Sequence, residues 1–204
     1  MDETVTLKDG MQARIKTWDL EDIRSFTRDN LDAVIVRNGG LHVYEGFRFL
    51  RPSLPAEIER TDPRNRYEEE LYISPLEHQE DGSGPKENYH RALAGTIDGT
   101  VVGVFLCQWA KFSSGFWHYH ARFLDVHEDH KNKGIGTVLV KALDQSDFIK
   151  GKILYIGRYS EEGRERIEHV IDREMSGEDY ALVHHDYIGN TPRRYGVYKG
   201  IDLF

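Results

Sequence analysis

The stretch at residues 116–146 reads FWHYHARFLDVHEDHKNKGIGTVLVKALDQS, and it contains the strongest structural signal in the chain. Its first part, 116–126, is rich in aromatic and β-branched residues and predicts a strand. Its last part has apolar residues at helical spacing: Ile135, Leu139, Ala142 and Leu143. A polar, basic turn that contains glycine, 131–136, joins the two. The order strand, glycine turn, helix is one that can bind phosphate.

The glycine turn has the features of an anion site. The first N–H groups of a helix lack backbone partners, and the aligned peptide dipoles make that end positive. Gly134 and Gly136 would let the backbone approach an anion without a Cβ in the way, and Lys131 and Lys133 add positive charge. Glycines are also common in ordinary strand-to-helix turns, so a purely structural turn is the alternative.

Two common phosphate motifs fit this turn poorly. The Walker pattern requires Lys followed by Ser or Thr after its last glycine, whereas Gly136 is followed by Thr137 and Val138. The dinucleotide fingerprint requires a third glycine, and Leu139 occupies that position.

The stretch resembles the GNAT superfamily of acyl-CoA-dependent N-acyltransferases. That family's signature is Arg/Gln-x-x-Gly-x-Gly/Ala, placed directly after a strand and opening a helix. Gly134 and Gly136 match it, and Lys131 stands where Arg or Gln is usual, at a position that contributes mostly its backbone. The resemblance covers roughly residues 5–187 in the order of elements, and it is specific across about 90–157.

The whole chain, 1–204, is expected to form a single GNAT-like acyltransferase domain of the α/β (α+β) class. We expect a mixed, mostly antiparallel sheet of six to seven strands with splayed central strands, flanked by about four helices. The elements expected from local patterns are strands at 11–18, 89–97, 101–108, 116–126, 152–157, 180–185 and 197–201, and helices that begin after Asp19, at 135 and at 161. Asp98-Gly99 favours a tight hairpin between the second and third of these strands.

The segment at 38–66 is less regular. Glycines and prolines interrupt it, and the aromatic residues Tyr44, Phe47 and Phe49 suggest a short packed helix or a loop beside the substrate. A short acidic helix is expected at 67–78 and a flexible loop at 80–86. In the family this region shapes the acceptor site.

The resemblance also implies a binding site for the coenzyme. Two parallel neighbouring strands, 116–126 and 152–157, should splay apart and leave main-chain groups that a ligand must meet. The pantetheine arm would pair with the main chain of Leu124, Asp125 and Val126, and a main-chain N–H near Val126 would stabilise the oxyanion. The pyrophosphate would be held by the amides of Lys131, Asn132, Lys133, Gly134, Ile135, Gly136 and Thr137.

His120 is the residue expected to act as the general base. His118 and His120 are two apart on one strand and therefore share a face, and Leu124 and Val126 have the same parity. The alternative is a strand histidine with no chemical role. No metal site is expected, because neither His118 and His120 nor His184 and His185 have a third ligand at a convincing spacing.

The general acid departs from the family pattern. The family often places a Tyr in the helix after the fifth strand, near Ile167 here, and no Tyr occurs between Ser160 and Asp179. Tyr159, Tyr180, Tyr187 and Tyr195 are alternatives among which the sequence does not choose.

Composition limits the classes of function. The chain has 204 residues and a net charge of -8, from 27 basic and 35 acidic side chains, which argues against broad binding to nucleic acid or to an anionic membrane. Cys107 is the only cysteine, so no internal disulfide can form. The start, MDETVTLKDG, has no apolar signal-peptide core, and a cytoplasmic protein is expected.

The expected function is transfer of an acyl group, in the first instance acetyl, from acyl-CoA to a primary amine of a small molecule or protein. One alternative is a non-catalytic acyl-CoA-binding or regulatory module on the same fold. Another is an interaction domain whose glycine turn is only a turn. The acceptor, the acyl length and the oligomeric state, monomer or homodimer, stay open.

Overall fold

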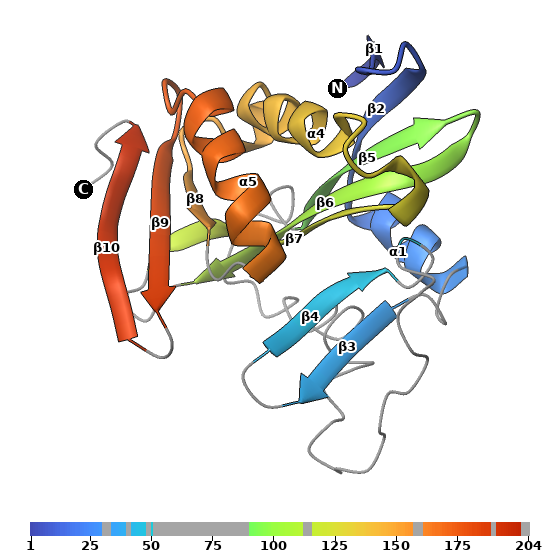
Figure 1. Cartoon of the computed structure of the whole chain (residues 1–204). Helices are drawn as coiled ribbons and strands as arrows, with labels where there is room; N and C mark the ends of the chain where they lie inside the picture. The colour runs from blue at the N-terminus through green and yellow to red at the C-terminus, as the bar shows by residue number, and fades with distance from the viewer. Residues whose placement is uncertain are drawn as a thin grey trace.

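The computed structural model describes residues 1–29, 34–39, 42–47, 50, 90–111, 116–156, 161–188 and 191–200 (Figure 1). Eight strands form one sheet in the order β1-β2-β5-β6-β7-β8-β9-β10, and β3 and β4 form a separate hairpin. The strands are β1 (Asp2–Thr6), β2 (Gln12–Trp18), β3 (Val34–Gly39), β4 (His42–Phe47), β5 (Arg91–Ile97), β6 (Thr100–Lys111), β7 (Trp117–Val126), β8 (Ile153–Ile156), β9 (Ala181–Ile188) and β10 (Thr191–Gly200). The helices are α1 (Leu20–Asp29), α4 (Ile135–Asp144) and α5 (Glu161–Glu174), with short 3-10 turns η6 (Glu128–His130) and η7 (Asp147–Ile149).

The sheet confirms the predicted mixed α/β class. Its pairs are antiparallel except β7 with β8 and β8 with β9, which are parallel. The sheet has one strand more than the predicted maximum because β1, a polar edge strand, was not expected. Asp98 and Gly99 have φ values of 49° and 79°, as the predicted tight hairpin between β5 and β6 requires. None of the described helices has both the length and the apolar character needed to cross a membrane.

The prediction for the start of 38–66 is wrong. Tyr44 and Phe47 lie in strand β4, not in a helix or loop. Gly39 pairs with His42, so the glycine that ends β3 lies next to the point where the chain reverses into β4. This hairpin lies on the side of β7 away from α4, and β4 contacts β7 (Figure 1). The predicted features at 67–78 and 80–86 lie outside the described residues.

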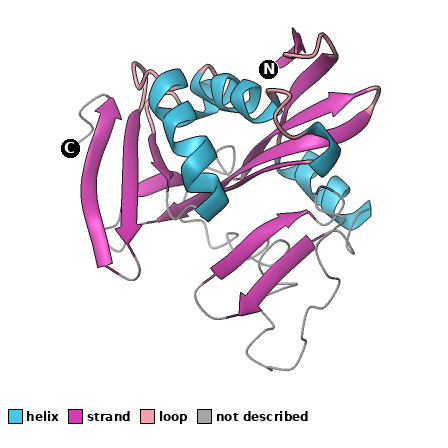
Figure 2. Cartoon of the chain, in the orientation of Figure 1, coloured by secondary structure: helices cyan, strands magenta, loops and turns pink. Residues whose placement is uncertain are grey.

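Helices cover both faces of the sheet (Figure 2). On one face α4 and α5 pack over a large apolar core that includes Leu139, Leu143 and Ile171. On the other face Ile23 of α1 packs against Val104 and Leu106 of β6. The sheet is therefore buried on both sides, which explains why β5 and β6 are almost continuously apolar.

A pair of glycines determines where α4 begins. Gly95 of β5 lies opposite Gly103 of β6, and the first residue of α4, Ile135, rests on both. A Cβ at Gly103 would lie 2.7 Å from Ile135 Cγ2 and 3.1 Å from Leu139 Cδ1. The sheet therefore has no side chains on its surface at this point. The start of α4 comes closer to the sheet than any larger residue would allow.

We expect Gly103→Ala to lower the free energy of unfolding by about 1–3 kcal/mol, because the buried Ile135 must move. Gly136→Ala is the matched control, since its new Cβ would meet no atom closer than 3.8 Å. That variant should be neutral or stabilising by up to about 1 kcal/mol, because Ala favours helix. Urea denaturation measures both variants. Equal effects at the two positions would contradict the close approach at Gly103.

Candidate functional site

Strands β7 and β8 form a fork. Among the described residues they pair at Tyr119 with Leu154, His120 with Tyr155 and Ala121 with Ile156. β8 is described as far as Ile156, and β7 continues for five more residues, 122–126, beside β6. Within the described part of the chain, no strand pairs with this free edge of β7. The fork lies where the predicted splay was expected.

The ladder between β6 and β7 determines which main-chain groups face the fork. The His127 N–H donates to Val102 O at 2.8 Å, and Val126 is the partner of Gly103. Because antiparallel neighbours alternate, the N–H and C=O groups of Leu124 and Val126 point to the free edge. The main chain of Asp125 points toward β6, so the predicted main-chain contact of Asp125 does not match this geometry.

The carboxylate of Asp125 accepts a hydrogen bond from one of the main-chain donors at this edge. Asp125 is only 2% exposed, and its Oδ1 accepts a hydrogen bond from the Val126 N–H at 3.0 Å. A ligand that needs the Val126 N–H would therefore compete with this carboxylate. The Leu124 N–H and the carbonyls of Leu124 and Val126 remain directed to the edge.

The glycine turn forms a sharp bend before α4. Asn132 has φ 64° and Gly134 has φ 99°, both in the left-handed region that a glycine adopts easily. Gly134 is the N-cap residue of α4 and has no side chain to cap the helix. The Lys131 N–H donates to Glu128 O. Residues 131–134 form turns, and no close main-chain hydrogen bond from the N–H groups of 132–137 is found among the described residues, so these N–H groups are the candidate anion donors.

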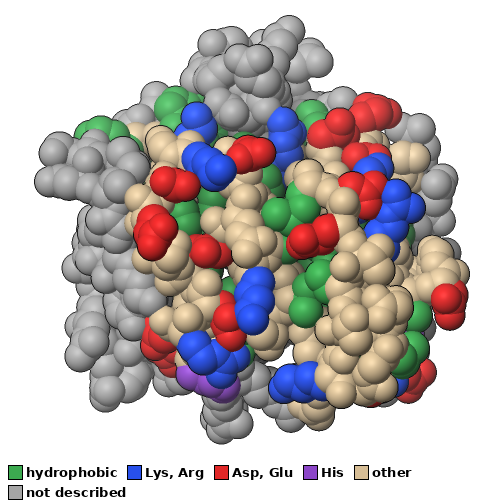
Figure 3. All heavy atoms as spheres, turned by 90° about the horizontal axis from the view of Figure 1, so that it is seen from above, with side chains coloured by type: hydrophobic (Ala, Val, Ile, Leu, Met, Phe, Trp, Pro, Cys, Tyr) green, Lys and Arg blue, Asp and Glu red, His purple; other side chains and the backbone are tan. Residues whose placement is uncertain are grey.

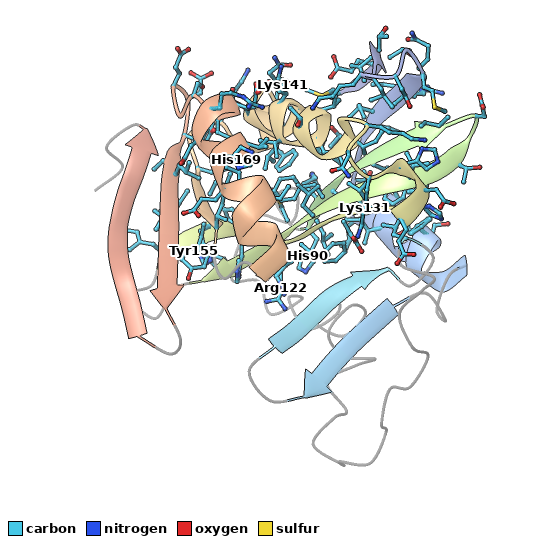
Figure 4. All side chains as sticks on the ribbon, in the orientation of Figure 1. His90, Arg122, Lys131, Lys141, Tyr155 and His169 are labelled. Atoms are coloured by element: carbon cyan, nitrogen blue, oxygen red, sulfur yellow. The ribbon has the colours of Figure 1, made fainter. Side chains whose placement is uncertain are left out.

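The turn between β1 and β2 holds the bend from outside. The Lys8 N–H donates to Lys133 O at 3.2 Å, and Lys133 Nζ lies 3.9 Å from Asp9 Oδ2. The aliphatic part of Lys8 lies against the open side of Gly134. Figure 4 shows Lys131 at the bend, and Figure 3 shows basic and acidic side chains interspersed on the face of the molecule seen from above.

The bend and the fork meet at Gly136. A Cβ on Gly136 would lie 3.8 Å from Ile167 Cδ1 of α5, 3.9 Å from Leu124 Cδ2 and 3.9 Å from Val126 Cγ2. The first turn of α4 therefore faces residues 124–126 of β7, and a Cβ at Gly136 would make only ordinary van der Waals contacts there. Main-chain donors at one end and apolar walls at the other suit a ligand with an anionic head and a narrow arm.

A bulge in β7 corrects the predicted orientation of the histidines. Cys107 pairs with Ala121 and Leu106 with Phe123, so Arg122 is an extra residue in β7. Before the bulge Tyr119 and Ala121 face the core under α4, and after it Leu124 and Val126 do. His118 and His120 consequently lie on the opposite face from Leu124 and Val126, and the parity argument was wrong. The role of His120 as base stays a prediction.

The two histidines share their face with Tyr155. The ring centroids of His120 and Tyr155 are 4.9 Å apart, and those of His118 and Tyr155 are 5.6 Å apart. The two imidazoles are 6.1 Å apart. Sequence reasoning missed Tyr155, and only the parallel register of β8 against β7 could have revealed it. Figure 4 shows Tyr155 and Arg122 on the side of the sheet away from Lys141 of α4.

Burial keeps both imidazoles neutral at pH 7. Loss of water lowers the pKa of His118 to about 4. Loss of water, with the positive charge of Arg122, lowers the pKa of His120 to about 3. Neutral imidazole is the form that can accept a proton, although these values make both groups weak bases in the free protein.

Tyr180, one of the alternative general acids, does not lie near the bend. Its hydroxyl donates to Asp144 Oδ1 at 2.6 Å, at the C-terminal end of α4, and burial raises its pKa well above the ordinary value. A helix of ten residues is about 15 Å long, so Tyr180 lies far from the bend. The side chains of Tyr159, Tyr187 and Tyr195 lie outside the described set.

We expect acid to destabilise the protein partly through His118. The unfolded chain takes up a proton at this side chain below pH about 6.5, whereas the folded chain does so only near pH 4. The folding free energy linked to His118 is therefore lost as the pH falls through this window, by about 2–3 kcal/mol at pH 4.5. Urea denaturation at pH 7 and pH 4.5 should show a smaller loss for His118→Gln than for the wild type. The exposed His169 is the control, and an equal loss in His118→Gln and His169→Gln would contradict the burial effect.

Comparisons with known proteins identify the family of this chain. The model of the "Acetyltransferase (GNAT) family" matches residues 54–156. A search of curated proteins finds no match.

Solved structures give similarities at the level of the fold. A ribosomal-protein-alanine N-acetyltransferase from Brucella melitensis biovar Abortus 2308 is 22% identical, with 77% of this chain and 89% of that chain covered and a TM-score of 0.41. An aminoglycoside acetyltransferase from an uncultured soil metagenomic sample, in complex with sisomicin, is 11% identical, with 86% and 95% covered and a TM-score of 0.46. A glucosamine-6-phosphate N-acetyltransferase from Arabidopsis thaliana is 10% identical, with 78% and 89% covered and a TM-score of 0.42. These values carry no argument about the substrate.

The family assignment rests on the family model. It covers half of the chain, and the matched segment contains both fork strands, the bend and α4. The chain therefore belongs to the acetyltransferase (GNAT) family.

Proposed function

We propose that this protein is an N-acyltransferase that moves an acyl group, in the first instance acetyl, from acyl-CoA to a primary amine of a small molecule or protein. One observation carries the proposal. At Gly136 the bend with its N–H groups meets the free edge of β7, and together they suit a diphosphate joined to an amide-bearing arm.

The binding half of the site uses mainly the backbone. The N–H groups of 132–137 would hold the diphosphate, and Lys131 and Lys133 would supply charge. The Leu124 N–H and the carbonyls of Leu124 and Val126, which no described strand pairs, would pair with the pantetheine arm as a strand would. When bound, acyl-CoA supplies an activated thioester carbonyl at the fork.

The chemical half of the site depends on placement. Holding an amine against a thioester removes much of the entropic barrier. His120 lies in the second-to-last described pair of β7 and β8 and is the residue that would accept the amine proton. Ile167 lies beside Gly136, near the position where the family often has a Tyr, and has no proton to donate to the leaving thiolate.

Ile167 also motivates a second candidate function, a non-catalytic acyl-CoA-binding or regulatory module. This alternative shares the binding half and lacks turnover. A single domain over 1–204 in the cytoplasm, without nucleic acid or membrane as partner, stays a prediction, as does the choice between monomer and homodimer.

We expect Gly136→Glu to abolish binding of acetyl-CoA, because a carboxylate would project between Leu124 and Ile167 toward the diphosphate. Isothermal titration calorimetry with acetyl-CoA measures the affinity, and circular dichroism checks the fold. Gln145→Glu, at the other end of α4, adds the same charge about 15 Å away and should bind normally. If Gly136→Glu keeps the wild-type affinity, the bend does not hold the diphosphate.

We expect free thiol to be released when the wild type is mixed with acetyl-CoA and at least one member of an amine panel. The panel consists of polyamines, aminoglycosides, amino acids and peptide N-termini, and a thiol reagent follows the reaction. At a hundredfold excess over Kd, acetyl-CoA should also stabilise the fold by about 2.7 kcal/mol. Stabilisation without turnover would favour the non-catalytic module. If acetyl-CoA neither stabilises the fold nor reacts, the glycine bend is only a structural turn.

A further inference from the structure

Tyr155 and His120 are paired at the point where the fork opens. Their register pair precedes the last pair of β7 and β8, Ala121 with Ile156. Ala121 belongs to the core under α4, so the neighbouring His120 projects to the opposite face of the sheet. The ring of Tyr155 lies on that face too, as its contacts with both histidines show. An amine that reaches the fork from this face would meet these rings.

The imidazole of His120 packs against the ring of Tyr155, and this contact can orient it. The Tyr155 ring is at 77° to the imidazole of His120 and at 76° to that of His118, both edge-on arrangements that aromatic rings prefer. His118 is only 3% exposed and therefore has little freedom to turn. One tyrosine ring thus contacts both members of the histidine pair.

Among the described side chains, no polar interaction is found that would orient the imidazole of His120 in place of Tyr155. Arg122 of the same strand and His118 are the charged or titratable groups that act on it electrostatically. Its partner across β6 is Gln108, which is neutral, and its partner across β8 is Tyr155. No described carboxylate forms a hydrogen bond or ion pair with the imidazole, as would be needed to fix its orientation through charge.

We propose that Tyr155 is a positioning residue, whose ring holds the His118–His120 pair against the sheet so that His120 presents one fixed edge at the mouth of the fork. The effect of Tyr155 on catalysis rests on the proposed function, whereas its effect on the position of His120 rests on the ring contacts alone. The aromatic ring of Tyr155, and not its hydroxyl, is proposed to hold His120.

The variants separate the ring from the hydroxyl. Tyr155→Phe keeps the ring, whereas Tyr155→Leu removes it, and Tyr155→Met is a second ring-free variant with a more adaptable side chain. Phe148→Leu is the matched control, because Phe148 makes a similar edge-on contact, at 5.2 Å, with Tyr119 on the opposite face of the sheet. Thermal melts confirm that each variant is folded.

The first measurement is a histidine NMR titration, which requires no acceptor. Resonances are assigned with His118→Gln and His120→Gln. In Tyr155→Leu and Tyr155→Met, water reaches the imidazoles, so the His120 midpoint should rise by about one pH unit or more toward its ordinary value. Tyr155→Phe and Phe148→Leu should leave it unchanged. An unchanged midpoint in both ring-free variants, or an equal rise in Tyr155→Phe, overturns the proposal.

The second measurement uses the amine that the panel identifies. Loss of the ring should lower kcat about tenfold or more, without changing the KM for acetyl-CoA, whereas Tyr155→Phe should stay within about threefold of the wild type. A kcat that falls equally in Tyr155→Phe assigns the role to the hydroxyl and overturns the proposal. If the wild type turns over no amine, the proposed function fails, and the NMR titration still decides whether Tyr155 holds His120.

Discussion

The contact of Ile135 with the glycine pair Gly95 and Gly103 is the constraint on which the candidate site depends. It brings the start of α4 down onto β5 and β6. Because β7 is bonded to β6, the same contact sets the distance between the bend and the free edge of β7. The bend cannot drift outward either, since Lys8 of the turn between β1 and β2 is bonded to Lys133 O. The main-chain donors of the bend are therefore held in place from below and from outside.

The bulge at Arg122 lets one strand serve both faces of the sheet. After the bulge, Leu124 and Val126 face Gly136 and α5, where the proposed coenzyme site lies. Before the bulge, His118 and His120 face the other side, with Tyr155. A regular strand would have put all four side chains on one face. The extra residue instead places the residues proposed to bind the coenzyme arm and those proposed for proton transfer on opposite faces of the sheet.

The site differs from the family pattern in the chemistry of its side chains. An isoleucine, Ile167, lies beside Gly136, where the coenzyme is proposed to bind. Beside the fork, Tyr155 contacts the buried His118 and the half-buried His120, whose pKa values loss of water lowers to about 4 and about 3. A site of this kind relies on placement and on exclusion of water more than on a strong base, which suits an already activated thioester.

Local patterns determined much of this protein. The strands before and after the bend, the hairpin at Asp98-Gly99, the glycine bend and helix α4 all follow from periodicity and turn chemistry, which act between near neighbours in the chain. Only the tertiary structure decided the face of His120, the contact of Tyr155 with it, and the hairpin of β3 with β4. Alternation predicts a face only along an uninterrupted strand, and the bulge at Arg122 shifts it by one residue. The register between the parallel strands β7 and β8 is likewise set by how the whole sheet packs, because no tight turn joins them.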